Sequence, residues 1–265
     1  MEKFNEVGFL SNDLGSWIDQ VRNVFKPEFA AAVRINRLAM EVLFSLPAED
    51  MTEAHLTGNL CFARALQSFQ TTILLSERGA LADARTLVRS ATETAIALAN
   101  CRIDPTMPAQ IAEDADLHRS KLAKSLLEAN KSKNSLTEEK IAELGATVSE
   151  VAKLYGAKGP TKINWAQKAS AAGMGDLYDI AYRTMSGDGA HCTVWSLGHH
   201  HSLNAGGNGP GFVFRPEREE LDNVLFTACS VMLHALASVI DWFGLDPFAG
   251  EMSACVSDWK SMRTS

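Results

Sequence analysis

The chain has 265 residues, of which 46% are hydrophobic and 22% are charged, and this composition is that of a globular protein rather than a disordered one. The formal net charge of −7 argues against a dedicated DNA- or RNA-binding protein, because such proteins usually carry an excess of Lys and Arg. The same charge still allows a local basic patch that contacts RNA.

The cysteines indicate a reducing compartment. Their number is odd and no two stand at zinc-site or redox-motif spacing, so reduced thiols are expected at Cys61, Cys101, Cys192, Cys229 and Cys255. Residues 1–6 contain no basic stretch that leads into an apolar one, so no signal peptide is expected. No phosphate-binding glycine loop or dinucleotide fingerprint is present. We therefore expect a cytoplasmic protein with no cofactor and no metal.

Helical periodicity dominates the chain, and strand alternation is nearly absent. Pro27 suits the first turn of a helix, and Gly79 suits a helix end that joins two antiparallel neighbours by a very short connection. Ser135 and Glu138 form a capping-box pattern, with Ser135 as the N-cap. Helices are expected at about residues 12–26, 27–46, 52–78, 80–101, 108–130, 136–155, 165–172 and 176–185.

The last third of the chain differs in character. Residues 202–216 contain four glycines and two prolines, which predicts a loop with one short extended piece at 212–214. Residues 216–220 place a proline and acids in the first turn of a last long helix. The apolar segment 221–243 contains four polar residues, Asp222, Asn223, His234 and Asp241, so it predicts a buried core helix and not a membrane span.

These elements predict an all-α, multi-helix bundle with a Gly-rich loop before a long buried C-terminal helix. We expect an N-terminal helical segment (1–50) packed on a helical core domain (51–248), followed by a polar C-terminal tail (249–265).

Two stretches place polar side chains where burial is costly. Arg85, Arg89 and Glu93 are spaced by four and share one side of a helix, and Arg89 and Glu93 lie near the apolar Ile96. One interpretation is an Arg–Glu pair that braces the helix. The other is that Arg89 and Glu93 point into a polar cleft between helices.

The second stretch gathers Tyr182, Ser186, Asp188 and His191 at a glycine-rich helix end. His191 has the right chemistry for a general acid or base near neutral pH. The alternative is that Ser186 and Asp188 only cap or turn the chain and that His191 is a core histidine.

Other histidines are interpreted as structural. Residues 199–201 are three adjacent histidines, but they lack a second ligand pair, which favours a surface loop over a metal site. Asp114 and His118 share a helix face and predict a hydrogen-bonded pair. His234 is expected in the core.

Both stretches together carry a family resemblance. The matching residues are Gly79, Ala84, Leu87, Arg89, Ser90, Glu93, Tyr182, Ser186 and His191, and in this order and spacing the chain from about residue 60 to 195 resembles the bacterial DUF5677 family of unknown function. The resemblance implies an all-α domain in a bacterial cytoplasm whose polar residues meet in one cleft. The HEPN superfamily of RNA-cleaving toxins carries an Arg and a His separated by four to six residues on one helix. Here seven residues, two of them glycines, separate Arg183 from His191, so the chain departs from that motif.

Three functional hypotheses follow. In the first, the cleft binds a small anionic ligand or a partner peptide, with Arg85, Tyr182, Ser186 and Asp188 as ligand-binding residues. In the second, a HEPN-like enzyme of phage defence or a toxin system acts on RNA or a nucleotide, with Arg89, Glu93 and His191 as catalytic residues. In the third, the polar set is structural and function lies in partner or homo-oligomer surfaces. The first two require Arg89, Glu93 and His191 to converge in one pocket.

Overall fold

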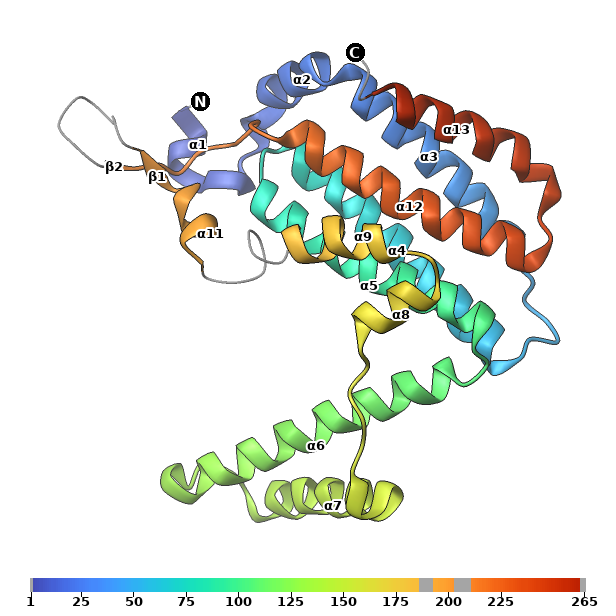
Figure 1. Cartoon of the computed structure of the whole chain (residues 1–265). Helices are drawn as coiled ribbons and strands as arrows, with labels where there is room; N and C mark the ends of the chain where they lie inside the picture. The colour runs from blue at the N-terminus through green and yellow to red at the C-terminus, as the bar shows by residue number, and fades with distance from the viewer. Residues whose placement is uncertain (1, 186–192, 203–210, 263–265) are drawn as a thin grey trace.

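The computed structural model describes residues 2–185, 193–202 and 211–262, and in these residues the fold is all-α, as the sequence predicts. Four long helices form the bundle: α3 (Lys26–Ser45), α4 (Glu53–Glu77), α5 (Leu81–Ile103) and α12 (Leu221–Phe243) (Figure 1). Strands β1 (His201–Ser202) and β2 (Gly211–Phe212) pair antiparallel, with His201 opposite Phe212. The short extended piece expected at 212–214 therefore begins one residue earlier.

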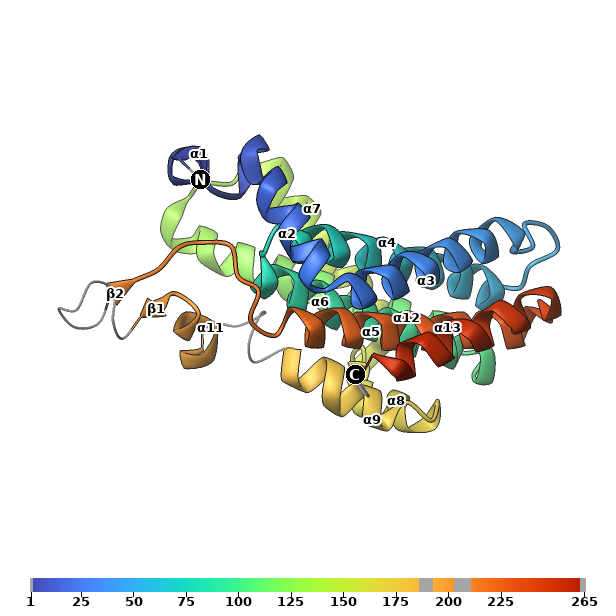
Figure 2. The ribbon, with the colours of Figure 1, turned by 90° about the horizontal axis from the view of Figure 1, so that it is seen from above.

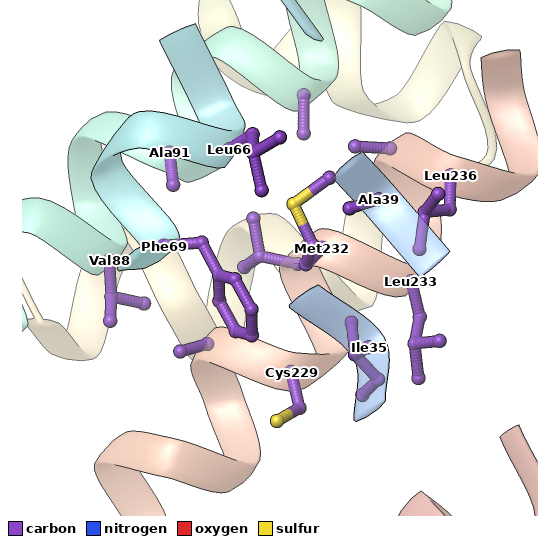
Figure 3. Packing of buried hydrophobic residues seen from close by; sticks show 14 of the residues in the cluster. Ile35, Ala39, Leu66, Phe69, Val88, Ala91, Cys229, Met232, Leu233 and Leu236 are labelled. Carbon is purple, nitrogen blue, oxygen red and sulfur yellow. The ribbon is translucent and has the colours of Figure 1, made fainter. Parts of the chain in front are cut away.

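Helix α12 lies at the centre of the core, between α3 on one side and α4 and α5 on the other. Figure 3 shows Met232 of α12 beside Phe69 and Leu66 of α4 and Ile35 of α3, all of them buried. By length and composition α12 is apolar enough to cross a membrane, but 61% of its apolar window is buried in this protein. Core packing explains its hydrophobicity without a bilayer.

Smaller elements surround the bundle. At the N-terminus lie α1 (Glu2–Val7), two 3-10 turns and α2 (Gly15–Val24). Helices α6 (Met107–Lys133) and α7 (Glu138–Tyr155) form a hairpin that projects from the bundle (Figure 1), and in the view from above it lies behind the bundle (Figure 2). The chain then returns through α8 (Trp165–Ala171), α9 (Gly175–Leu177), the π-helix η4 (Tyr178–Thr184) and α11 (Val194–Gly198).

Several expectations need correction. Thr137, not Ser135, caps α7, and its side chain accepts a hydrogen bond from the Lys140 backbone. Residues 216–220 precede α12 instead of forming its first turn, since Glu220 has a φ of 65° and the helix begins at Leu221. His234 is exposed on α12 rather than buried in the core.

The C-terminal residues are also more ordered than a polar tail. Ala249–Ser261 form helix α13, which packs on α3 and α12 and buries Cys255. Arg34 of α3 fixes this helix by ion pairs with Glu251 at 2.7 Å and Asp258 at 2.6 Å. The polar residues on the outer face of α13 suggested a tail, although its inner face is apolar and packs on the bundle.

Candidate functional site

Helix α5 carries the polar residues of the candidate site on successive turns. Arg85 is the first, and its side chain is only 2% exposed. Its Nη2 donates to Glu220 Oε2 at 2.9 Å, and its Nη1 lies 3.3 Å from Nε2 of His199. Because a guanidinium only donates, His199 Nε2 accepts this hydrogen bond, and the ring proton then lies on Nδ1.

His199 extends this network to a second carboxylate. Its Nδ1 lies 3.6 Å from Glu217 Oε2. Burial raises the pKa of Glu217, while the nearby His199 and Arg85 act in the opposite direction. We name Arg85, His199, Glu217 and Glu220 the Arg85 cluster.

Backbone contact between two distant segments positions this cluster. We call residues 211–220, which lead from β2 into α12, the strap. The Glu217 backbone N–H donates to the Gly79 carbonyl at 2.9 Å, where α4 turns into α5. Gly79 has a φ of 74°, and a Cβ there would lie 2.6 Å from the Glu217 nitrogen. Only glycine fits this turn, and the turn holds the strap carboxylates beside Arg85.

One turn further along α5, Arg89 meets the π-helix. Its Nη2 donates to the Tyr182 hydroxyl at 3.0 Å, and its guanidinium carbon lies 4.8 Å from the centre of the Tyr182 ring. The same nitrogen is 3.8 Å from Glu93 Oε1, a long ion pair. We name Arg89, Glu93 and Tyr182 the Arg89 cluster.

The Arg89 cluster is open to solvent. The side chains of Arg89 and Glu93 are 25% and 33% exposed. Within the described residues, Arg89 contacts protein acceptors through Nη2 alone, which leaves Nε and Nη1 to water or a ligand. Desolvation raises the pKa of the Tyr182 phenol, so the hydroxyl stays protonated at neutral pH.

Ring stacking limits what this cluster can bind. Tyr178 and Tyr182 stack with ring centres 4.7 Å apart, and Arg183 lies over Tyr178 at 5.5 Å. With Arg89 over Tyr182, the two rings are enclosed by protein groups. The arrangement therefore offers guanidinium donors to an anion and no stacking platform for a nucleobase.

The structure brings some predicted site residues together and not others. Arg89 and Glu93 meet Tyr182, which lies about ninety positions later in the chain. Arg85 is enclosed by its own partners, so its geometry does not support the ligand-binding role predicted for it. Ser186, Asp188 and His191 lie outside the described residues.

Sequence reasoning missed His199, Glu217 and Glu220. His199 was assigned to a surface loop with its two neighbours, and the acids to the first turn of α12. The expected Asp114–His118 pair is a contact of 3.5 Å between Nε2 of His118 and Oδ2 of Asp114. Across the part of the chain that the structure describes, no group of His, Cys, Asp and Glu suits a metal ion, and the four cysteines there are free thiols.

The fold and the two clusters together define a helical-bundle protein with an arginine-lined polar site between α5 and the segments that follow the hairpin. The chain matches the family described as "Family of unknown function (DUF5677)" over residues 55–208, which is more than half of its length, and it belongs to that family. No curated protein and no solved structure matches the chain. Glu217 and Glu220 of the Arg85 cluster lie beyond the matched residues.

Proposed function

We propose that the Arg89 cluster binds a small anionic ligand. The observation that carries this proposal is the state of the Arg89 guanidinium, which is held in place by Tyr182 while a quarter of the Arg89 side chain stays exposed. An arginine that is fixed before binding loses little freedom when an anion arrives. Carboxylate and phosphate groups match its paired N–H donors.

The π-helix supports the same proposal. Tyr182 lies in a seven-residue π-helix, a form that is rare and occurs frequently at functional sites. Tyr178 and Tyr182 lie four residues apart on η4, and their rings stack. Local geometry that is less stable than an α-helix is thus used to place one hydroxyl against Arg89.

Titration calorimetry with inorganic phosphate, and then with carboxylates and nucleoside phosphates, tests the proposal. We expect Arg89→Ala to weaken anion binding by roughly tenfold or more and Arg89→Lys to weaken it less. Arg64→Ala is the matched control, because Arg64 is exposed on α4 and its side chain donates a hydrogen bond to Gln67, three residues along the same helix. Equal anion affinity in wild type and Arg89→Ala would refute the proposal.

A different measurement distinguishes this proposal from the hypothesis of an RNA-directed enzyme. Cleavage of total RNA that is lost in a folded His191→Ala variant would indicate an enzyme, whether or not phosphate binds at Arg89. Within our proposal the protein works in the cytoplasm, since unpaired cysteines suit a reducing compartment.

A further inference from the structure

The α6–α7 hairpin projects from the bundle with little support from it (Figure 1). In the described part of the chain α7 packs mainly on α6, while only the start of α6, near Met107, joins the bundle. The buried residues between the two helices are few: Ser120, Ala123, Leu144 and Val151. Two helices with so small a core are marginally stable in water, so the hairpin gains from a further contact.

One face of the hairpin displays leucines to solvent. Leu122 is 62% exposed and Leu126 is 39% exposed, and their spacing of four puts them on one face of α6. Leu154 of α7 is 65% exposed. At about 100° per residue from the inward Ala123 and Leu144, Leu154 points to the same side of the hairpin as Leu122. The Arg119–Glu150 ion pair, at 3.4 Å, spans the two helices on this side.

Charges around these leucines differ between the two helices. On the leucine side, the same helical phase places Arg119 and Lys133 on α6, and Glu139, Glu143 and Glu150 on α7. Lys140 of α7 shares this side and pairs with Glu143 of its own helix at 2.7 Å. A twofold axis parallel to the hairpin would lay α6 of one copy over α7 of another, with Arg119 facing Glu150 and Lys133 facing Glu139. A surface with one basic helix and one helix of net negative charge is therefore complementary to itself.

We propose that the leucine side of the hairpin pairs with the same side of a second copy of this chain and forms a four-helix bundle. The pairing covers Leu122, Leu126 and Leu154 in both copies, and it matches the number of helices from which stable bundles are usually built. Self-complementary charge favours a second copy over an unrelated protein, whose charges would have to match both helices independently.

Sedimentation of the full chain over a range of concentrations tests the pairing. Wild type is expected to be a dimer, and Leu122→Glu combined with Leu126→Glu is expected to raise the dimer dissociation constant by roughly tenfold or more. The matched control is Leu60→Glu on α4, where Leu60 is 61% exposed, and its dimer should be unchanged. A monomeric wild type, or a folded double variant that dimerises as well as wild type, would overturn the proposal.

Charge reversal keeps the test valid if the double variant does not fold. Lys133→Glu and Glu139→Lys should each weaken the homodimer, and an equimolar mixture of the two should form a heterodimer by restoring opposite charges. Both residues are exposed, so neither change disturbs a core. Absence of recovery in the mixture, with both variants folded, would contradict the proposed orientation.

Discussion

Arg85 and Arg89 stand one turn apart on α5, yet their surroundings are opposite. Arg85 is enclosed and bonded to Glu220 and His199, whereas Arg89 is partly exposed and, among the described residues, has a hydroxyl and a long ion pair as partners. The difference arises from what packs over each turn. The strap brings carboxylates to Arg85, and the π-helix brings the neutral Tyr182 to Arg89. An arginine that is paired closely with carboxylates stabilises the fold. An arginine held by a neutral hydroxyl is less neutralised by the protein, so its positive charge can attract an anionic ligand.

Arg85→Ala should give the largest loss of stability. The change leaves His199 without its hydrogen-bond donor and the largely buried Glu217 without a nearby cation, and it opens a void beside α5, so we expect a loss of about 3 kcal/mol in the free energy of unfolding. Urea unfolding measures it. Arg89→Ala, the matched change one turn away, should cost about 1 kcal/mol or less because Arg89 is partly exposed. Equal losses for the two variants would remove the distinction between bracing and binding arginines.

Gly79→Ala should have the next largest effect. Alanine at a φ of 74° is strained, and its Cβ would overlap the Glu217 backbone. We expect a loss of about 2 kcal/mol by thermal or urea unfolding. Since the strap must move away, combining Gly79→Ala with Arg85→Ala should cost less than the sum of the single changes. Full additivity would show that the turn at Gly79 does not hold the Arg85 cluster together.

Sequence patterns predicted the bundle better than the clusters, for a physical reason. The spacing of Leu81, Ala84, Val88 and Ala91 reports a buried helix face directly, because helical geometry alone puts these residues together. The contact between Arg85 and Glu220 joins residues 135 positions apart and depends on how the strap lies, which no local period encodes. Gly79 was visible as a helix stop, but the close approach of Glu217 that requires glycine there was not.

The Arg89 cluster could be predicted in part, since polar residues on a packed face indicate either a bracing ion pair or a cleft between helices. Arg89, Glu93 and Tyr182 were all named as site residues and are in contact. The helix expected at 176–185 was right in place, but its π form has no sequence signal that we recognised. The glutamates before α12 were misassigned because a proline followed by acids is also the usual start of a helix.

Tyr182→Phe should have a smaller effect on stability and a measurable one on binding. It removes the hydroxyl that accepts from Arg89, which is worth about 1 kcal/mol, while the ring stack is kept. Anion affinity, measured by calorimetry, should fall severalfold because Arg89 is less well fixed. The pKa of Tyr182 is raised in the fold, so its contribution to stability is full below the ordinary phenol pKa and is lost as pH rises through the folded pKa. An alkaline decline in stability that is identical in Tyr182→Phe and wild type would exclude this residue as a source.

Glu217→Gln should have the smallest effect on the free energy of unfolding. The sign of this effect distinguishes Glu217 from Glu220, the other carboxylate of the Arg85 cluster. Burial raises the pKa of Glu217, so the fold favours its protonated form and loses stability as pH rises from the ordinary carboxyl range through the folded pKa. At neutral pH glutamine should therefore cost nothing or stabilise slightly, within about 1 kcal/mol, and wild type should gain on the variant as pH falls. Glu220→Gln is the comparison, since Glu220 is largely exposed and bonds to Arg85 directly, and this change should destabilise at neutral pH. Urea unfolding of both variants at several pH values measures the difference, and a clear loss of stability in Glu217→Gln at neutral pH would mean that the contacts of the Glu217 carboxylate with His199 and Arg85 outweigh the cost of burying the charge.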